Sequence, residues 1–288
     1  SGEVSLADAS AKLIGERAYD WAGSSLSGGG DVDGDGVPDV LIGASHYSAG
    51  GYLNAEKGAA YLVHGPVSGG FNLAWADAKL IGERQYDLAG TSVSLAGDLN
   101  GDGLDDVLVG AYHNDAAGAD AGAAYLLYGP VSGTMDLNAA DARLKGEAAD
   151  DDAGLSVSEA GDVDGDGLDD FLVGAKGNDE GGESAGAAYL VLGAVTGDLS
   201  LASADVKLLG EQPYDLAGWT VEGAGDVNAD GFADILVGAY IPLIGGATYL
   251  VLGPVSGTVN LSDADSRMLG EAMNDGSGLA LAGAGDVD

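Results

Sequence analysis

A repeat of about 64 residues runs through this chain and constrains its fold more than any other feature of the sequence. An acidic motif begins at Asp31, Asp98, Asp162, Asp226 and Asp286, so successive copies start 67, 64, 64 and 60 residues apart. Other segments recur at fixed places between these motifs, as "AKLIGE", "GAAYLVHG" and "AGSSLSGGG" do around the first copy. A periodic chain of this kind forms one supersecondary unit per copy and stacks the units to bury a shared core.

Each unit holds four short apolar segments of about strand length. Residues that favour turns separate them, and "GPVSG" recurs at residues 65, 129 and 253 as a turn signal. The short "LADA", "WADA" and "NAADA" pieces are too short to be independent helices. Four antiparallel strands per unit predict an all-β fold, a β-propeller of four-stranded antiparallel blades. An open β-solenoid is the alternative, and units of this length fit it less well.

The repeats divide the chain into units of one propeller domain or of a part of one. We expect units at residues 17–83, 84–147, 148–211 and 212–271, with an outer strand at 11–16 and a truncated fifth repeat at 272–288. Four complete blades would then have partial blade strands at each end. Because the chain starts with a lone outer strand and stops inside a fifth acidic loop, we expect it to be a fragment of a longer ring. Unpaired end strands would favour self-association.

The charge balance excludes several classes of partner. With 47 Asp and Glu against 10 Lys and Arg, the formal net charge is −37. Such a surface repels phosphate backbones and anionic lipids, so we expect no nucleic-acid binding and no membrane insertion. The chain has no cysteine, and no apolar run approaches the roughly 18 residues of a membrane span. Adaptation to high salt is a separate explanation for the acidity.

The acidic motif has the oxygen pattern of a calcium loop. In nine-residue windows such as "DVDGDGLDD" from Asp162, positions 1, 3, 5 and 9 are always Asp or Asn and position 6 is always Gly. Their side-chain oxygens and the carbonyl of position 7 give about five protein ligands, which water or bidentate binding raises to the six to eight that calcium takes. Magnesium, which demands stricter octahedral geometry, fits less well.

We expect about four calcium ions, one in each complete loop. The expected ligands are Asp31, Asp33, Asp35, Val37 and Asp39; Asp98, Asn100, Asp102, Leu104 and Asp106; Asp162, Asp164, Asp166, Leu168 and Asp170; and Asp226, Asn228, Asp230, Phe232 and Asp234. In the fourth loop Asn228 loses a charge and Ala229 replaces a glycine, so we expect this site to be the weakest.

An EF-hand and an empty turn are the two alternatives to a calcium loop of this kind. An EF-hand needs an acidic residue at position 12 and a helix after it. Position 12 here lies inside an apolar segment, as Ile42, Val109, Val173 and Val237. A solvated Asp-Gly turn without an ion is the other alternative, because both residues favour turns. Four loops with oxygens at identical positions argue against it.

Together these segments resemble the FG-GAP repeats that build the N-terminal β-propeller of integrin α subunits and related bacterial surface proteins. The matching parts are the "DxDGDGxxD" loop, the "DVLIGA" strand after it, the "GAAYLV" strand and the "LxGE" run into the next unit. The family's Phe-Gly is Ala-Gly here, as at Ala22 and Gly23, and the proline of its "GAP" is absent. The resemblance implies seven blades, with calcium hairpins on one face and ligands met on the opposite face.

The loops on that opposite face are rich in aromatic residues, which are favoured at binding hot spots. The aromatics of this expected rim are Tyr19, Trp21, Tyr47, Tyr52, Tyr86, Tyr112 and Tyr214. Packing between blades is their alternative role. An aspartate recurs among them with the period of the fold, as Asp20, Asp87, Asp151, Asp215 and Asp275, and we expect it to form turns. His46 and His113 fall at equivalent positions, and a transition-metal site there would need a third ligand.

No enzyme motif stands out, and the repeat accounts for almost every acidic cluster, so we expect a non-catalytic protein. The resemblance implies a calcium-stabilised extracellular or cell-surface module, in a secreted bacterial protein, that binds a protein ligand or an adhesion partner. A carbohydrate-binding propeller, or the non-catalytic domain of a secreted or surface enzyme, is the alternative, with a glycan stacked on the rim aromatics.

Overall fold

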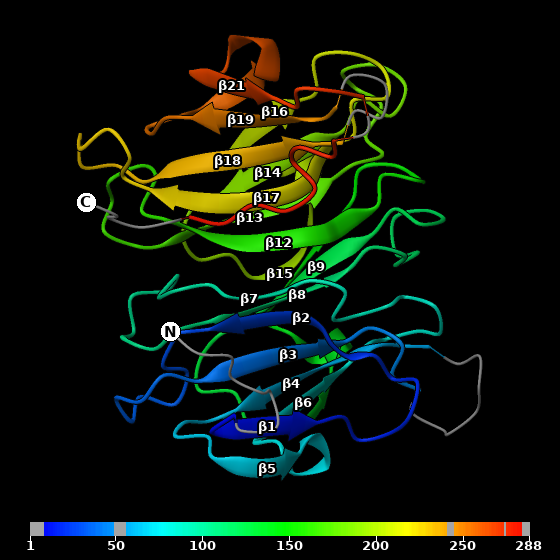
Figure 1. Ribbon diagram of the computed structural model, residues 1–288, viewed down its shortest axis with the longest axis vertical. Helices are drawn as coiled ribbons and strands as arrows, with labels where there is room; N and C mark the ends of the chain where they lie inside the picture. Colours follow the sequence, from blue (N-terminus) through cyan, green and yellow to red (C-terminus); the bar gives the residue numbers. More distant parts are fainter. Residues whose placement is uncertain (1–8, 49–55, 241–244, 274, 284–288) are drawn as a thin grey trace.

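The apolar segments of each repeat form strands, and each repeat folds into its own antiparallel sheet. The computed structural model describes residues 9–48, 56–240, 245–273 and 275–283. Figure 1 shows the sheets side by side in chain order, from blue at one end to orange at the other. The four sheets follow one another along an arc of propeller blades (Figure 1), and no strand pairing within the described ranges joins the first sheet to the fourth.

Each blade has the same four antiparallel strands. The first blade contains β2 (Ala22–Gly28), β3 (Val40–Ala44), β4 (Ala59–Val63) and β6 (Ala78–Ile81). The second contains β7 (Val93–Leu95), β8 (Val107–Ala111), β9 (Ala123–Leu127) and β11 (Ala142–Lys145). The third contains β12 (Ala153–Gly161), β13 (Asp170–Ala175), β14 (Ala187–Val191) and β16 (Val206–Leu209). The fourth contains β17 (Ala217–Gly225), β18 (Asp234–Ala239), β19 (Ala247–Val251) and β21 (Ser266–Leu269).

A further strand, which the sequence pattern did not predict, joins neighbouring blades at their outer edge. It starts at the last glycine of the "GPVSG" turn or its equivalent, as β5 (Gly69–Asn72), β10 (Gly133–Asp136), β15 (Gly197–Ser200) and β20 (Gly257–Asn260). Strands β10, β15 and β20 pair in parallel with β6, β11 and β16, the outer strands of the preceding blades. Strand β5 pairs in the same way with β1 (Ala11–Ile14). Three blades therefore have five strands rather than four.

A single 3-10 turn follows each of these strands, where the sequence has its short "LADA"-like pieces. The turns are η2 (Leu73–Trp75), η3 (Leu137–Ala139), η4 (Leu201–Ser203) and η5 (Leu261–Asp263). A polar residue caps each one, as Asn72 does by accepting a hydrogen bond from the Ala74 N–H at 2.8 Å. The first leucine of each turn is buried, which fixes the outer edge of the blade against the core.

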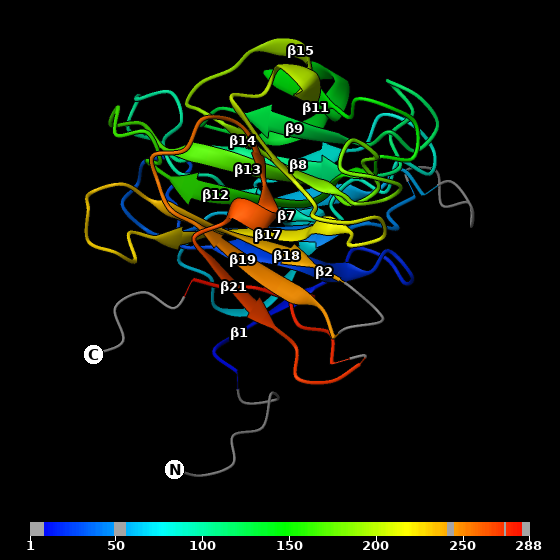
Figure 2. The same ribbon diagram turned by 90° about the horizontal axis from the view of Figure 1, so that it is seen from above.

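The hydrophobic core lies between the blades. In one cluster Leu41 and Leu62 of the first blade pack with Val107, Val109 and Tyr125 of the second, and equivalent clusters join the second blade to the third and the third to the fourth. Strands β9 and β14 are buried along their whole length because they have a blade on each side. Strand β4 of the first blade is also buried, since Leu13, Phe71 and Leu73 cover the side that has no complete blade. The inner strands β2, β7, β12 and β17 follow one another along the arc (Figures 1 and 2).

Close backbone contact between blades explains one glycine that the sequence repeats in every "IGA" or "VGA" strand. A Cβ atom on Gly110 of β8 would lie 2.0 Å from the carbonyl oxygen of Gly154 in the next inner strand. No side chain fits at that distance, so the strand needs glycine there. The Ala-Gly that replaces the Phe-Gly of the resembled repeats is compatible with this packing, since Ala89, Ala153 and Ala217 are fully buried.

Candidate calcium loops and the opposite rim

Two sets of loops lie at opposite ends of the second strand of each blade. The acidic loops connect the first and second strands of a blade. The loops expected to form the aromatic rim either lead into the first strand or connect the second and third strands. Because β3, β8, β13 and β18 run in the same sense across the arc, the acidic loops gather along one edge and the rim loops along the other (Figure 1). The opposite faces that the resemblance implied are therefore present.

Position 1 is the centre of each acidic loop. In the third loop Asp162 Oδ1 accepts hydrogen bonds from the backbone N–H groups of Gly165 at 2.7 Å and Asp166 at 3.1 Å, and Asp162 Oδ2 accepts one from Gly167 at 3.0 Å. Asp31 and Asp98 accept the same three bonds in their own loops. The chain therefore wraps around one carboxylate, and the later side chains of the loop face it.

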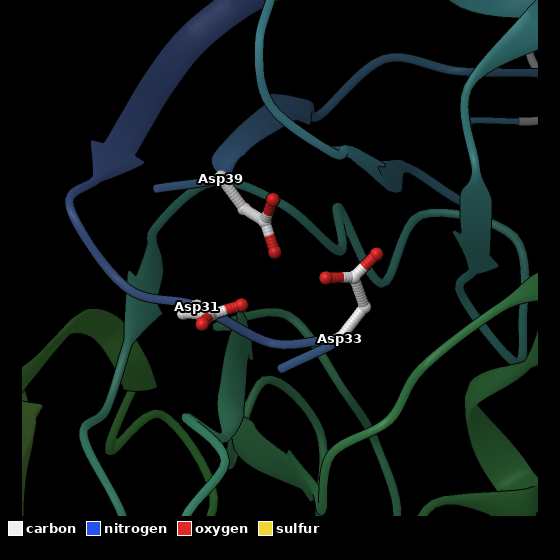
Figure 3. Close-up of side chains that lie close together, drawn as sticks. All are labelled: Asp31, Asp33 and Asp39. Atoms are coloured by element: carbon white, nitrogen blue, oxygen red, sulfur yellow. The ribbon is translucent and has the colours of Figure 1, made fainter. Parts of the chain in front are cut away.

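Carboxylates converge in the first and third loops. Asp31, Asp33 and Asp39 each place one oxygen within 4.8 Å of the others, and so do Asp162, Asp164 and Asp166. Figure 3 shows the carboxylates of Asp31, Asp33 and Asp39 around a common space. Asp35 and Asp170, which were also predicted as ligands, are outside these two groups.

The second and fourth loops have Asn at position 3, so they bring one carboxylate fewer. Asn100 Oδ1 accepts a hydrogen bond from the Asp102 N–H at 2.8 Å, as Asp164 does from Asp166 at 3.0 Å in the third loop. The Asn100 Nδ2 group donates to Asp102 Oδ2 at 3.0 Å, and Asn228 donates to Asp230 in the same way at 2.8 Å. The same backbone hydrogen bond to position 3 is therefore present in both kinds of loop, with an amide in place of a charged carboxylate.

The Asp at position 9 forms hydrogen bonds both within its loop and to the turn after the third strand of its blade. Asp106 Oδ2 accepts from the Leu99 N–H at 3.0 Å and Asp106 Oδ1 accepts from the Gly129 N–H at 2.9 Å. Asp39, Asp170 and Asp234 make the equivalent pair of bonds. All four side chains are buried. Burial, followed by the carboxylates of Asp102 and Asp98, raises the pKa of Asp106 to about 7, and burial likewise raises the pKa of Asp170 to about 6.

The chemistry of these donors fits calcium. Carboxylate and amide oxygens are the ligands of a hard cation, and a flexible set of four to five with room for water suits calcium better than magnesium. A divalent cation at such a loop would favour the ionised form of these buried carboxylates and so oppose the effect of burial on their pKa. The loops can therefore hold calcium, and the backbone carbonyls of Val37, Leu104, Leu168 and Phe232 remain predicted ligands.

Some polar residues at these loops were not predicted. Position 8 is Asp105 in the second loop and Asp169 in the third, and each side chain binds the preceding loop rather than its own. His64 Nδ1 lies 3.1 Å from Asp33 Oδ2 in the first loop. The signal for position 8 was visible as the doubled Asp of "LDD", but its partner lies in the loop of another repeat, about 70 residues away.

The predicted rim aromatics differ in exposure, and one of them is buried. Tyr19, Trp21, Tyr86 and Tyr214 have exposed fractions of 77%, 61%, 52% and 53%. Tyr112 is half-buried beside His113. Tyr47 is only 4% exposed, because its ring packs edge-on against Tyr61 and its hydroxyl accepts a hydrogen bond from Lys79 Nζ at 2.7 Å. Tyr47 is therefore a core residue, and Tyr52 lies outside the described residues.

The exposed rim aromatics lie in turns with an uncommon backbone conformation. Tyr19, Tyr86 and Tyr214 have φ values of 71°, 71° and 68°, a left-handed conformation that is uncommon for aromatic residues. The recurring Asp is buried in its first four copies and exposed as Asp275. It closes the turn, as Asp151 does by accepting from the Glu147 and Ala148 N–H groups at 2.9 and 2.8 Å. The expectation that this Asp forms turns is confirmed for Asp87, Asp151, Asp215 and Asp275.

Neither the histidines nor a serine motif of the rim builds a reactive site. His46 lies 4.0 Å from a Glu56 carboxylate oxygen and His113 lies 3.9 Å from one of Asp120, and neither belongs to a metal-ligating group found among the described residues. Residues 182–186 read "GESAG", the pattern of a nucleophile elbow. Ser184 has a φ of 48°, but Asp120 has the same φ at the same place of the second blade, and a strand rather than a helix follows.

Comparison with known protein families identifies the repeat of this chain. The FG-GAP repeat matches residues 22–63, 89–127, 155–191 and 217–250. Human integrin alpha-X is 34% identical over 173 residues, which cover 58% of this chain and 14% of that protein. Integrin alpha-PS2 of Drosophila melanogaster is 33% identical over 224 residues, which cover 73% of this chain and 15% of that protein. Human integrin alpha-IIb is 34% identical over 171 residues, 56% of this chain and 16% of that protein.

The chain thus spans about one seventh of the length of these relatives. In the part of the chain that the structure describes, no helix is both long enough and apolar enough to cross a membrane.

Proposed function

The chain belongs to the FG-GAP repeat family, and on that premise we propose that it is a calcium-stabilised, non-catalytic module that binds a protein partner through its aromatic rim. The observation that carries the proposal is the division of the arc into two edges. Repeated oxygen-rich loops lie along one edge, and exposed aromatic residues with left-handed backbone angles lie along the other.

When bound, calcium supplies the positive charge that the oxygens of each loop share. The residues of the chain shape the loop and connect it to its blade. Position 1 fixes the loop backbone, and position 9 links the loop to the turn after the third strand. Calcium affinities of extracellular modules are about 0.1–1 mM. At about 1 mM calcium each such site adds roughly 0.4–1.4 kcal/mol to the free energy of unfolding by mass action. The similarity to integrin alpha subunits is the reason why we propose an extracellular or cell-surface location.

The rim is suited to a protein partner because its aromatic side chains are exposed and one of them, Trp21, is supported by a neighbouring ring. An anchor that is ordered before binding loses little conformational entropy on binding. Trp21 is stacked on His46, with ring centroids 4.0 Å apart and an interplanar angle of 28°, so one ring face is supported while most of the side chain is exposed. Tyrosine and tryptophan are the side chains most often found at binding hot spots.

A glycan is the second candidate ligand, because a supported and exposed tryptophan ring can also stack on a sugar. The two are separated by a protein pull-down and a glycan array, each done with the whole chain in calcium and with chelator. We expect protein capture that is reduced at least tenfold by Trp21→Ala and is unchanged by Trp75→Ala, a substitution of an exposed tryptophan in η2. Capture of glycans alone, with the same dependence on Trp21, would replace the protein ligand by a carbohydrate.

Self-association is a further part of the proposal. The outer strands β6, β11 and β16 each have a strand on both sides, whereas among the described residues β21 is paired only with β19. Met268 and Leu269 of β21 are exposed. We propose that this edge pairs with a second copy. Light scattering at increasing concentration is expected to show dimers that Met268→Lys weakens, and a monomer throughout the range would contradict the proposal.

A further inference from the structure

The acidic loops of neighbouring blades are bound to one another. The backbone N–H of Asp98, at position 1 of the second loop, donates a 2.9 Å hydrogen bond to Asp169 Oδ2 at position 8 of the third loop. The backbone N–H of Asp169 donates back to the Asp98 carbonyl oxygen at 3.3 Å. Asp31 and Asp105 make the same two bonds between the first and second loops, at 2.5 and 3.1 Å.

A second contact lies beside this pair of bonds. The side chain at position 7 of each following loop lies over position 4 of the loop before it. A Cβ atom on Gly34 would be 2.7 Å from Leu104 Cδ2, and one on Gly165 would be 2.6 Å from Phe232 Cε1. A side chain at position 4 would therefore press against the position 7 side chain where another loop follows. Ala229 at position 4 of the fourth loop is exposed, since no following loop is among the described residues.

These contacts reach the residues that would hold the ion. Position 1 is the carboxylate around which each loop is wrapped, so its backbone sets where the central ligand lies. Asp169 holds that backbone in the second loop, while the next residue along the chain, Asp170, is a predicted ligand in its own loop. An ion that orders the end of one loop therefore also orders the group that holds the start of the other.

We propose that Asp105 and Asp169 are positioning residues that make calcium binding cooperative among the first three loops. The inference rests on the proposed calcium binding and adds how the sites communicate. Ordering one loop lowers the entropy that the neighbouring loop loses on binding, and by linkage each ion favours the other by the same factor. The third and fourth loops are joined less strongly, because position 8 of the fourth loop is Ala233.

Ala233 keeps only the backbone part of the contact. Its N–H donates to the Asp162 carbonyl oxygen at 2.9 Å, but it has no carboxylate to accept from the Asp162 N–H. The chain thus contains two contacts between neighbouring loops that have the side-chain hydrogen bond and one that lacks it. The third contact is an internal control for the other two. Asp105 and Asp169 also place a negative charge near the preceding loop, so the test must separate the hydrogen bond from the charge.

The experiment is a calcium titration of the whole chain in about 0.15 M salt, where the Debye length is about 8 Å and charge effects between loops are reduced. Backbone N–H signals of the position 6 glycines, Gly36, Gly103, Gly167 and Gly231, report each loop separately. The variants are Asp169→Ala, Asp169→Asn, which keeps an oxygen acceptor without the charge, and Ala233→Asp. Asp263→Ala, at an exposed acidic residue of η5, is the control for loss of one charge.

We expect Asp169→Ala to weaken calcium binding at the second loop about fivefold, although it removes no predicted ligand of that loop. Asp169→Asn restores most of that affinity, Ala233→Asp tightens the third loop by a similar factor, and Asp263→Ala changes neither. Calcium binding in which Asp169→Ala leaves the second loop unchanged, or in which Asp169→Asn is as weak as Asp169→Ala, overturns the coupling and leaves the proposed function intact. A titration in which no loop responds overturns both.

Discussion

The Tyr189 hydroxyl donates a 2.9 Å hydrogen bond to Glu147 Oε1, and Lys207 Nζ forms an ion pair with the same carboxylate. Glu147 follows the outer strand of the second blade, whereas Tyr189 and Lys207 belong to the third. Tyr61 with Glu16 and Lys79, and Tyr125 with Glu83 and Arg143, repeat the arrangement. A half-buried carboxylate between a cation and a phenol therefore links the segment after one outer strand to the blade that follows it.

Removal of the phenol oxygen from one of these contacts between neighbouring blades is expected to destabilise the fold. Tyr189 is fully buried, and its oxygen also accepts a hydrogen bond from Asn178 Nδ2 at 3.2 Å. Tyr189→Phe leaves the amide of Asn178 without that acceptor, so we expect the free energy of unfolding to fall by about 1–3 kcal/mol. Urea denaturation in calcium measures it. Tyr19→Phe, at an exposed residue, should change stability by less than about 0.5 kcal/mol, and equal effects would contradict the role of this contact.

Substitutions at position 4 of two loops are expected to act in opposite directions. Ala229 has a left-handed φ of 61°, so Ala229→Gly relieves strain and should stabilise the chain by about 0.5–1 kcal/mol. Gly165 has a φ of 82° and lies under Phe232, so Gly165→Ala adds strain and a clash and should cost more than about 1 kcal/mol. Thermal melting in calcium compares the two variants with the unchanged chain. A gain in stability from both would contradict the contact between loops.

Stability in the absence of divalent cations should depend on pH through Asp87. Burial raises the pKa of Asp87 to about 6, against about 3.9 in an unfolded chain. The folded state therefore holds this proton more tightly, so the contribution of Asp87 to stability is best below about pH 4 and falls as the pH rises through 6. The fall can reach about 3 kcal/mol.

Comparison with Asp87→Asn isolates this effect from the other carboxylates. Urea denaturation of both proteins in chelator, from pH 4.5 to 7.5, should show the unchanged chain losing stability relative to the variant as the pH rises. A difference between the two that stays constant over this range would show that Asp87 does not titrate as its burial requires.

The fourth loop is expected to fill last in a calcium titration. Asn228 brings one charge fewer than Asp164 does in the third loop, and Ala229 strains the loop backbone. Residues 226–230 are also exposed, while position 1 of the other three loops is half-buried. The N–H signal of Gly231 should therefore change at a higher calcium concentration than those of Gly36, Gly103 and Gly167. Earlier saturation of Gly231 would contradict this order.

Periodicity was sufficient to predict the blades and their calcium-type loops. Segments such as "DVLVGA" and "GAAYLL" are apolar, short and bounded by turn residues, so their strand character is local information. Strands β5, β10, β15 and β20 were missed because "GGFN", "GTMD", "GDLS" and "GTVN" have no apolar alternation and contain glycine or aspartate. Their partner is the outer strand of the preceding blade, which no local pattern identifies.

The same distinction holds for the candidate sites. Positions 1, 3, 5 and 9 of the loops could be read from spacing because a loop-type calcium site takes most of its ligands from one short segment of the chain. The roles of Asp105 and Asp169 depend on which loop lies next to which, and the burial of Tyr47 depends on Tyr61 and Lys79 of other strands. Composition alone could not separate Tyr47 from the exposed Tyr19.

The most direct test of the account is a crystal structure of the chain grown in calcium, with anomalous scattering recorded at long wavelength. We predict an anomalous peak in each of the four complete loops, between the side-chain oxygens of positions 1, 3, 5 and 9, in blades arranged as described. Loops that hold only water under these conditions would contradict the claim that calcium stabilises this arc of FG-GAP blades.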